Sequence, residues 1–265
     1  MSCRPMSRIF VAGVVVLLAA CATPSTRPPV EIREALAPAG KLRVGVYAGS
    51  PTSMVRGASG EVRGVSIDLG AELAKRLGVA VERVEFPRLA DVLDAMKAGK
   101  VDFTVTNATP ARAKDLDFTP PVLNIELGFL VAPRAPIAAM GEVDRAGVRV
   151  GVAQGSTTQT TLPGALKNAA IVAAPTVKAA TEMLAKGELD AFATNKAILF
   201  EMSDALPGSR VLDGRWGLEH LAIAIPKGRD AGLPYVRTFA ADAMAEGLVA
   251  RAAQRAGLRG SVRAE

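Results

Sequence analysis

The run TVTNATPARAKDLDFTPP, residues 104–121, places a single arginine behind a series of small hydroxyl and amide side chains. Thr109 is a favourable N-cap and is followed by proline, which suits a first helical position, so the run predicts a helix that begins at Thr109. Arg112 would then offer a planar set of donors at the positive end of that helix. This arrangement suits a carboxylate bound through two hydrogen bonds. The alternative is a surface ion pair of Arg112 with Asp115 or Asp117.

A second run of similar character is Gln154-Gly155-Ser156-Thr157-Thr158, which follows a predicted strand and opens a predicted helix. Such a turn presents backbone N–H groups and hydroxyls to an anion. Ser156 and Thr157 are therefore further candidates for anion binding. The alternative is that one of them only caps its helix.

Strand-like and helix-like segments alternate along the chain on either side of these runs. The first set has strands at 42–46, 79–86 and 101–105 and helices at 67–77 and 89–96. The second set has strands at 148–152, 171–174 and 189–194 and helices at 157–166 and 177–185, the former interrupted or ended early by Pro163-Gly164. This spacing predicts βαβ units with mostly parallel sheets, and its restart predicts two lobes.

Two apolar extended segments are each bounded by a proline: 127–131 lies between the two sets, and 220–225 follows the second set. We expect them to pair as hinge strands. Residues 231–258 are expected to form helices that pack back on the first lobe. The predicted α/β fold therefore has lobe 1 at 40–127 and 226–265, and lobe 2 at 128–225 including the hinge strands.

The N-terminus has the pattern of a secretory signal. Arg4 and Arg8 precede an apolar run over 9–20, which is too short for a comfortable bilayer span of about 20 residues. The quartet LAAC that ends at Cys21 resembles the lipobox of bacterial lipoproteins, which implies cleavage of 1–20 and lipidation of Cys21. The alternative is an ordinary signal peptide. Residues 21–39, rich in Pro, Ser and Thr near their start, are predicted to be a tether.

Composition narrows the function classes. Cleavage of the first 20 of 265 residues would leave 245, remove Cys3 together with Arg4 and Arg8, and lower the formal net charge from +6 to +4. Cys21 would then be the only cysteine, so no intrachain disulfide is expected. The mild basic excess is spread along the chain and does not indicate nucleic acid binding.

The ordered motifs resemble the bacterial extracellular solute-binding proteins of family 3, the receptors of polar amino-acid ABC importers. The resemblance covers about 41–258 and rests on GKLRVGV, GEVRGVSIDLGAELAKRLG, MKAGKVDF, TPAR with DFTPP, RVGVAQGSTTQ, GELDAFATN and HLAIAIPKG. It implies the two-lobed periplasmic-binding-protein fold, with a ligand held in the cleft outside the carboxyl ends of the strands.

The resemblance also implies roles for particular residues. Arg112 matches the arginine that clamps the ligand α-carboxylate, and the turn at Ser156 and Thr157 matches the one that closes on the same carboxylate from the second lobe. The loop from Thr106 to Thr109 matches a ligand-contacting loop. It carries Asn107 where the family usually has threonine, and the stretch from Asp102 to Arg112 is a couple of residues shorter than the common pattern.

Departures from the family pattern concern the ligand ammonium. Asn195 stands where amino-acid receptors commonly have an aspartate, and Tyr47 and Ser50 stand at the usual acidic and aromatic positions of the first lobe. Both ammonium-binding carboxylates are thus expected to be absent. The predicted ligand is an organic acid, or an amino acid held by neutral hydrogen bonds.

The resulting hypothesis is a monomeric, lipid-anchored periplasmic protein, on the inner or the outer membrane, that delivers a small carboxylate-bearing solute to an ABC permease without cofactor or metal. An enzyme on the same scaffold, dehydratase-like, and a ligand-sensing subunit of a membrane partner are the alternatives. The only histidine, His220, falls at a hinge strand, and Glu126 is expected to make a hinge or surface contact, so no catalytic residue is predicted.

Overall fold

The computed structural model describes residues 27–262, so the predicted signal segment and Cys21 lie outside the described residues. The helices are α1 (Val30–Leu36), α2 (Val65–Leu77), α3 (Leu89–Lys97), α4 (Thr157–Ala165), α5 (Val177–Lys186), α6 (Lys196–Ala205), α7 (Leu233–Ala245) and α8 (Leu248–Arg255), with 3₁₀ turns η1 (Arg112–Lys114) and η2 (Met140–Glu142). The strands are β1 (Lys41–Tyr47), β2 (Val55–Arg56), β3 (Val62–Arg63), β4 (Ala80–Phe86), β5 (Thr104–Asn107), β6 (Leu116–Phe118), β7 (Leu123–Val131), β8 (Arg149–Ala153), β9 (Ala170–Ala174), β10 (Ala191–Asn195), β11 (Arg210–Val211), β12 (Gly217–Pro226) and β13 (Ser261–Val262).

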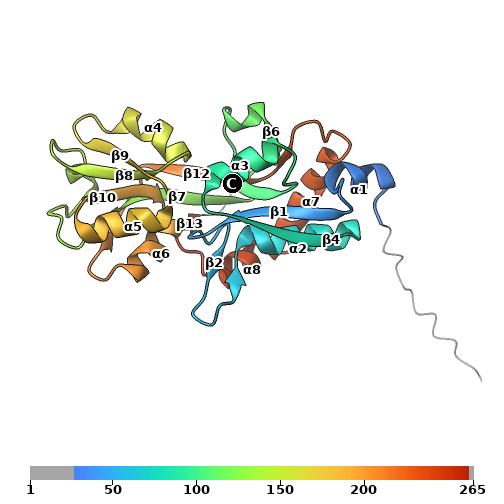
Figure 1. The fold of residues 1–265 in the computed structure, drawn as a ribbon, viewed down its shortest axis with the longest axis horizontal. Coiled ribbons are helices and arrows are strands. Elements are labelled where there is room, and N and C mark those ends of the chain that lie inside the picture. The colour runs from blue at the N-terminus through green and yellow to red at the C-terminus, as the bar shows by residue number, and fades with distance from the viewer. Residues whose placement is uncertain (1–26, 263–265) are drawn as a thin grey trace, which may run out of the picture.

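The first lobe is built on the parallel pair β1 and β4, which align from Lys41 opposite Ala80 to Tyr47 opposite Phe86. Helix α2 buries Leu69, Leu73 and Leu77 because these residues recur every four positions on one helical face. The helix ends at a left-handed glycine, as its sequence predicts. Helices α7 and α8 complete this core after the chain returns from the second lobe (Figure 1).

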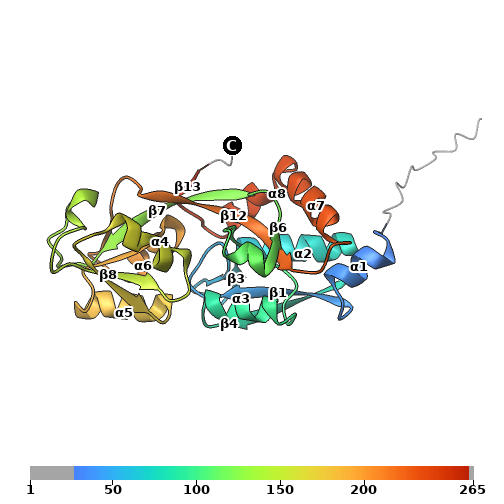
Figure 2. The ribbon, with the colours of Figure 1, turned by 90° about the horizontal axis from the view of Figure 1, so that it is seen from above.

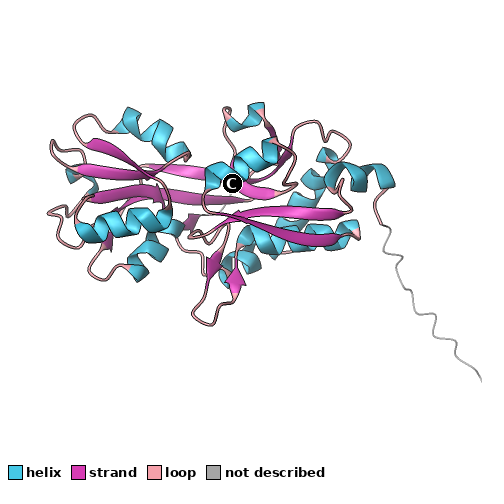
Figure 3. Ribbon diagram, viewed as in Figure 1, coloured by secondary structure: helices cyan, strands magenta, loops and turns pink. Residues whose placement is uncertain are grey.

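The second lobe repeats the arrangement. Strands β9, β8 and β10 are parallel neighbours, and α4 and α5 flank them (Figure 3). Helix α4 includes Pro163 in its last turn and ends at Ala165. The predicted span of 157–166 is therefore matched to within one residue, whereas the interruption or early end expected at Pro163-Gly164 does not occur.

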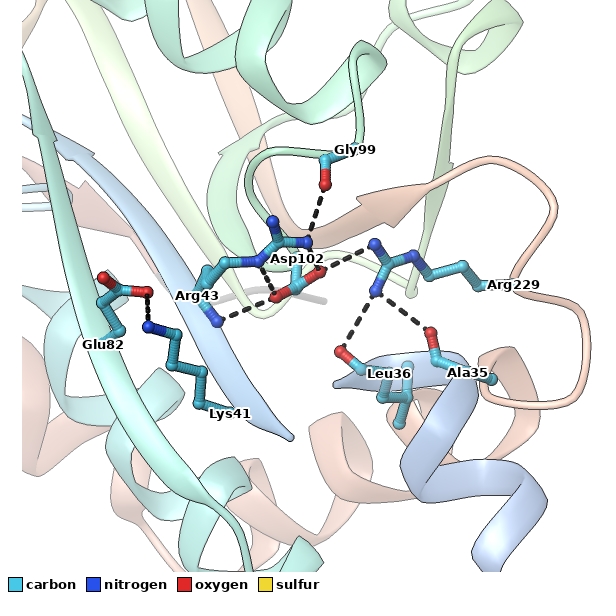
Figure 4. A network of polar contacts seen from close by, with 8 residues as sticks. All are labelled: Ala35, Leu36, Lys41, Arg43, Glu82, Gly99, Asp102 and Arg229. Carbon is cyan, nitrogen blue, oxygen red and sulfur yellow. Dashed lines mark hydrogen bonds and ion pairs between the residues drawn. The ribbon is translucent and has the colours of Figure 1, made fainter. Parts of the chain in front are cut away.

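Each lobe contains an arginine in its first parallel strand that binds a distant aspartate through both its backbone N–H and its guanidinium. Arg43 at the start of β1 binds Asp102 through its backbone N–H at 2.9 Å and its guanidinium at 2.7 Å. Arg149 at the start of β8 binds Asp190 in the same manner, with the backbone contact at 2.8 Å. In the first lobe Arg229 adds a second cation to the buried Asp102, at 2.7 Å (Figure 4).

Strands β7 and β12 connect the lobes, as their apolar pattern predicts (Figure 2). They pair antiparallel with each other over Leu123–Leu127 and Gly217–Leu221. The far half of β7 pairs with β10 in the second lobe, whereas the far half of β12 pairs with β5 and β6 in the first. The predicted two-lobed α/β fold with two hinge strands is confirmed.

Two local predictions differ from the structure. Residues 30–36, placed in the tether, form α1, because Leu36 is fully buried in the first core and Arg229 binds the carbonyls of Ala35 and Leu36 (Figure 4). The helix expected to begin at Thr109 is only the turn η1. The chain leaves it at once to place the buried Leu116 in β6.

Within residues 27–262, no helix is long and apolar enough to cross a membrane.

Candidate ligand-binding site

A pocket lies between the lobes and is lined by residues of both and of β12. It encloses about 640 Å³ of empty space, counting its mouth. Its polar lining comprises Tyr47, Thr52, Arg88, Thr106, Asn107, Arg112, Gln154, Ser156, Thr157, Thr176, Thr194, Asn195 and Glu219. Its apolar lining comprises Pro87, Leu89, Val105, Ala153, Pro175, Val177, Ile198 and Leu221. Seven of the nine residues expected to bind the ligand are brought together here.

Arg112 is largely enclosed by the pocket and is bound only by neutral groups. Its Nη1 donates to Thr106 Oγ1 at 2.8 Å and to the carbonyl of Asn107 at 3.1 Å. Burial lowers the pKa of Arg112, and the negative charge of Glu219 opposes this effect. An arginine nonetheless stays charged at neutral pH, so the pocket contains a permanent cation.

The expected alternative partners of Arg112 are occupied elsewhere. Asp115 pairs with Lys97 at 3.1 Å and Asp117 pairs with Lys227 at 2.6 Å. Among the described residues, no carboxylate lies within 4.0 Å of the Arg112 guanidinium. The surface ion pair that the sequence left open is therefore not formed.

Thr157, at the start of α4, joins the lobes. Its hydroxyl accepts from Asn107 Nδ2 at 3.2 Å and lies 3.2 Å from the Glu219 carboxylate, to which it donates. Arg88 and Gln154 form a second contact across the cleft, also at 3.2 Å. These contacts show the lobes in a closed arrangement.

Ser156 is the N-cap of α4, since its hydroxyl accepts from the backbone N–H of Gln159 at 3.2 Å. The capping alternative thus applies to Ser156, while Thr157 faces the polar groups of the cleft. The first turn of α4 still directs its backbone N–H groups toward the pocket end of the helix.

Glu219, on β12, is a charged residue of the pocket lining that was not among the residues predicted from the sequence. Its side chain is buried, and its carboxylate accepts from Asn195 Nδ2 at 2.8 Å and from Thr157. The residue lies one position before the predicted hinge strand. A charged side chain next to a long apolar strand was the available signal. The family's two ammonium-binding positions carry Tyr47 and Asn195 here, but Glu219 places a carboxylate elsewhere in the pocket lining.

Asn195 is less available to a ligand than predicted. Its Oδ1 accepts from the backbone N–H of Ile198 at 3.1 Å and so caps α6, while its Nδ2 donates to Glu219. The amide thereby has a fixed orientation, with both polar ends in use.

Tyr47 lines the pocket, but Ser50 does not. Ser50 is fully buried behind the wall, within 2.8 Å of the Thr52 hydroxyl, and it hydrogen-bonds Tyr47. Thr52 occupies the wall instead. Burial raises the pKa of Tyr47 to about 12, so its phenol is neutral and can donate a hydrogen bond.

Thr109 lies outside the pocket, beside a wider opening on the other side of Arg112. Its hydroxyl accepts from the backbone N–H of Arg112 at 3.3 Å, which holds the turn η1. The predicted N-cap contact therefore exists, but it positions Arg112 and does not line the pocket.

The remaining candidate acid and base lie away from the pocket lining. Glu126 pairs with Lys196 at 2.7 Å and with Arg215 at 3.4 Å, consistent with the expected hinge contact. His220 is exposed, and its Nδ1 lies 2.9 Å from Asn124 Oδ1. Between residues 27 and 262, no group of three or more His, Cys, Asp or Glu residues is placed to hold a metal ion.

The two lobes, the two connecting strands and the pocket between them define a periplasmic-type solute-binding protein. The chain matches the family described as bacterial extracellular solute-binding proteins, family 3, over residues 42–257. It therefore belongs to this family.

Individual relatives are distant. The L-arginine-binding protein of Pseudomonas aeruginosa is 26% identical over 199 residues, which cover 71% of this chain and 76% of the relative. The ABC transporter glutamine-binding protein of Bacillus subtilis is 24% identical over 177 residues, which cover 65% of this chain but only 64% of the relative.

Solved structures agree with this assignment. The solute receptor for L-cysteine of Neisseria gonorrhoeae has a TM-score of 0.74 at 25% identity, with 84% of this chain and 92% of that chain covered. An ancestral amino acid-binding protein described as a precursor of cyclohexadienyl dehydratase has a TM-score of 0.71 at 26% identity, with 84% and 97% covered.

Proposed function

We propose that this protein is the substrate-binding lipoprotein of an ABC importer and captures a small carboxylate-bearing solute, an amino acid or a related organic acid, by closure of its lobes. The observation that carries the proposal is the environment of Arg112. A largely enclosed guanidinium that is hydrogen-bonded only by a hydroxyl and a carbonyl has lost hydration without gaining a carboxylate in direct contact, since Glu219 acts on it only from a distance. A ligand carboxylate would supply that counter-ion through two parallel hydrogen bonds.

Closure is supported by the origin of the pocket residues. Arg112 belongs to the first lobe and Thr157 to the second, and both line the pocket, across which Asn107 and Thr157 are in contact. A ligand that contacts both lobes favours the closed state by its differential affinity for that state. Docking to a permease would then depend on closure.

The proposed localisation of the protein is based on the signal-like pattern of its N-terminal residues. Cleavage before Cys21 and lipidation of that residue would hold a monomeric binding protein at the inner or outer membrane, on the periplasmic side. Mass spectrometry of the protein from membranes of a native-type host should find diacylglycerol on Cys21. An unmodified N-terminus at another position contradicts the anchor.

The non-enzymatic function is part of the proposal. The relatives described above are solute-binding proteins, although one neighbour is an ancestor of a dehydratase. A dehydratase would require a general acid in the cleft, and Glu219 is the one carboxylate among the described lining residues. Turnover of prephenate-like acids by the purified protein would establish the enzyme alternative.

Titration calorimetry with refolded, ligand-free protein tests the proposed capture. The twenty L-amino acids and a set of plain carboxylic acids are the probes. At least one should bind, and Arg112→Gln should weaken it by about 2–5 kcal/mol, roughly 30- to 4,000-fold in Kd.

The matched control is Arg134→Gln, which removes the same charge from the exposed surface of the second lobe and should leave Kd unchanged. Binding of no probe, or full affinity in the Arg112 variant, would refute the proposal.

A further inference from the structure

Glu219 is a buried carboxylate with no cation in direct contact. It is 8% exposed, and the two groups that bind it, the Asn195 amide and the Thr157 hydroxyl, are neutral. In the part of the chain that the structure describes, no Lys, Arg or His nitrogen lies within 4.0 Å of it. A carboxylate accepts about four hydrogen bonds, so half of its capacity is open toward the pocket.

The Asn195 amide cannot rotate to relieve this charge. Its Oδ1 is held by the backbone N–H of Ile198 at the start of α6, which directs Nδ2 to Glu219 at 2.8 Å. The reverse orientation would break the cap and place an amide oxygen against a carboxylate oxygen. Glu219 is therefore held as an acceptor at a fixed point of the pocket wall.

We propose that Glu219 is the anionic half of the ligand site and receives the ammonium group of an α-amino acid whose carboxylate is bound by Arg112. This inference rests on the proposed function and narrows its substrate class from carboxylates to zwitterions. The two charged groups line one pocket, with Arg112 on the first lobe and Glu219 on the strand that joins the lobes. A zwitterion places an opposite charge in direct contact with each of these groups, whereas a plain carboxylic acid leaves Glu219 without a contacting cation.

The pair Asn195 and Glu219 explains why position 195 carries no charge. An aspartate there would place a second carboxylate at about the 2.8 Å that now separates the amide from Glu219. Two carboxylates at that distance cannot both ionise. The negative charge of the pocket thus lies on Glu219 of β12, and the Asn195 amide stabilises it by donating a hydrogen bond.

Glu219 also links ligand recognition to closure. The Thr157 hydroxyl that donates to Glu219 accepts from Asn107 of the opposite lobe, and Asn107 Oδ1 accepts from the backbone N–H of His220. The carboxylate proposed to bind the ammonium is therefore hydrogen-bonded to Thr157, the residue that contacts Asn107 of the opposite lobe. A variant could weaken binding by disturbing either role, so the test must separate them.

Calorimetry with matched ligand pairs separates the two roles. Each L-amino acid that binds is compared with its deamino analogue, such as propanoate for L-alanine and 4-carbamoylbutanoate for L-glutamine. The wild-type protein should prefer the amino acid by about 10- to 100-fold. Glu219→Gln should remove this preference, so that the Kd values for the amino acid and its deamino analogue differ by no more than about threefold in the variant.

The double variant Asn195→Asp, Glu219→Gln returns one carboxylate to the same corner of the pocket. It should regain about tenfold or more of the lost preference, because the amide and the carboxylate have exchanged places. Circular dichroism and thermal unfolding of both variants check that they fold.

Two results would overturn the inference while leaving the capture of carboxylates intact. One is equal affinity of the wild-type protein for the amino acid and its deamino analogue. The other is an equal loss for both ligands in Glu219→Gln, which would make Glu219 a structural link between the lobes. Binding of neither ligand class is a distinct result, since it refutes the proposed function itself.

Discussion

Replacement of Arg112 by methionine should make the ligand-free protein more stable while removing its affinity for carboxylates. The largely enclosed guanidinium is hydrogen-bonded only by Thr106 and the carbonyl of Asn107, and among the described residues no carboxylate lies within 4.0 Å of it, so Glu219 offsets its charge only in part. Dehydration of an unpaired ion costs several kcal/mol. Methionine fills similar volume without that cost, but it leaves the Asn107 carbonyl unpaired, at about 1–3 kcal/mol.

The net gain in the free energy of unfolding should be about 1–3 kcal/mol, which corresponds to a rise in Tm of about 2–12 °C for a chain of this size. Differential scanning calorimetry of refolded, ligand-free protein measures it. Arg134→Met, on the exposed surface, is the matched control and should shift Tm by no more than about 2 °C. A lower Tm for Arg112→Met would show that the charge is already compensated, and would refute the reasoning.

Three further predictions concern groups around the site and its supports. Asp102→Asn removes a fully buried negative charge from two partly buried arginines, Arg43 and Arg229, and should lower the free energy of unfolding by about 3–5 kcal/mol in urea titrations. The more exposed Asp115→Asn should cost less than about 1 kcal/mol, and equal losses would contradict this. The pKa of Asp190 is lowered, chiefly by its hydrogen bonds with Arg149, so its contribution is present above the unfolded-state pKa of about 3.9 and is lost as the pH falls further. Asp190→Asn should therefore cost about 1–3 kcal/mol at pH 7 and progressively less below about pH 4, and a cost independent of pH would argue against this pairing. The pKa of Tyr47 is raised to about 12, so stability should fall as the pH rises from 10 to 12; absorbance titration at 295 nm should show an ionisation near pH 12 that Tyr47→Phe removes, and its persistence in that variant would reassign it.

The sequence predicted the architecture well because the architecture depends on apolar periodicity. Alternating strands and helices, the glycine after α2 and the two apolar crossing segments are local signals that the tertiary structure keeps. Helix α1 was missed because its burial comes from one residue, Leu36, and from the distant Arg229, which binds its last carbonyls. Neither the burial of Leu36 nor the contact with Arg229 can be inferred from the amino-acid composition of residues 21–39.

The site was predicted in part for a similar reason. Arg112 and Thr157 stand in runs of polar residues at the ends of strands, which local sequence reveals. Ser50 and Thr52 are both small hydroxyl residues in the same turn. The sequence does not show which of the two side chains faces the pocket. Glu219 lies 24 residues from Asn195, and only the pairing of strands brings them to 2.8 Å.

The crystal structure of the complex with the tightest-binding amino acid tests the central claim most directly. Both carboxylate oxygens of the ligand should lie within hydrogen-bonding distance of the Arg112 guanidinium, in the pocket that Thr157 closes from the second lobe. A ligand bound in that pocket with its carboxylate directed away from Arg112, or bound elsewhere on the molecule, would contradict the account.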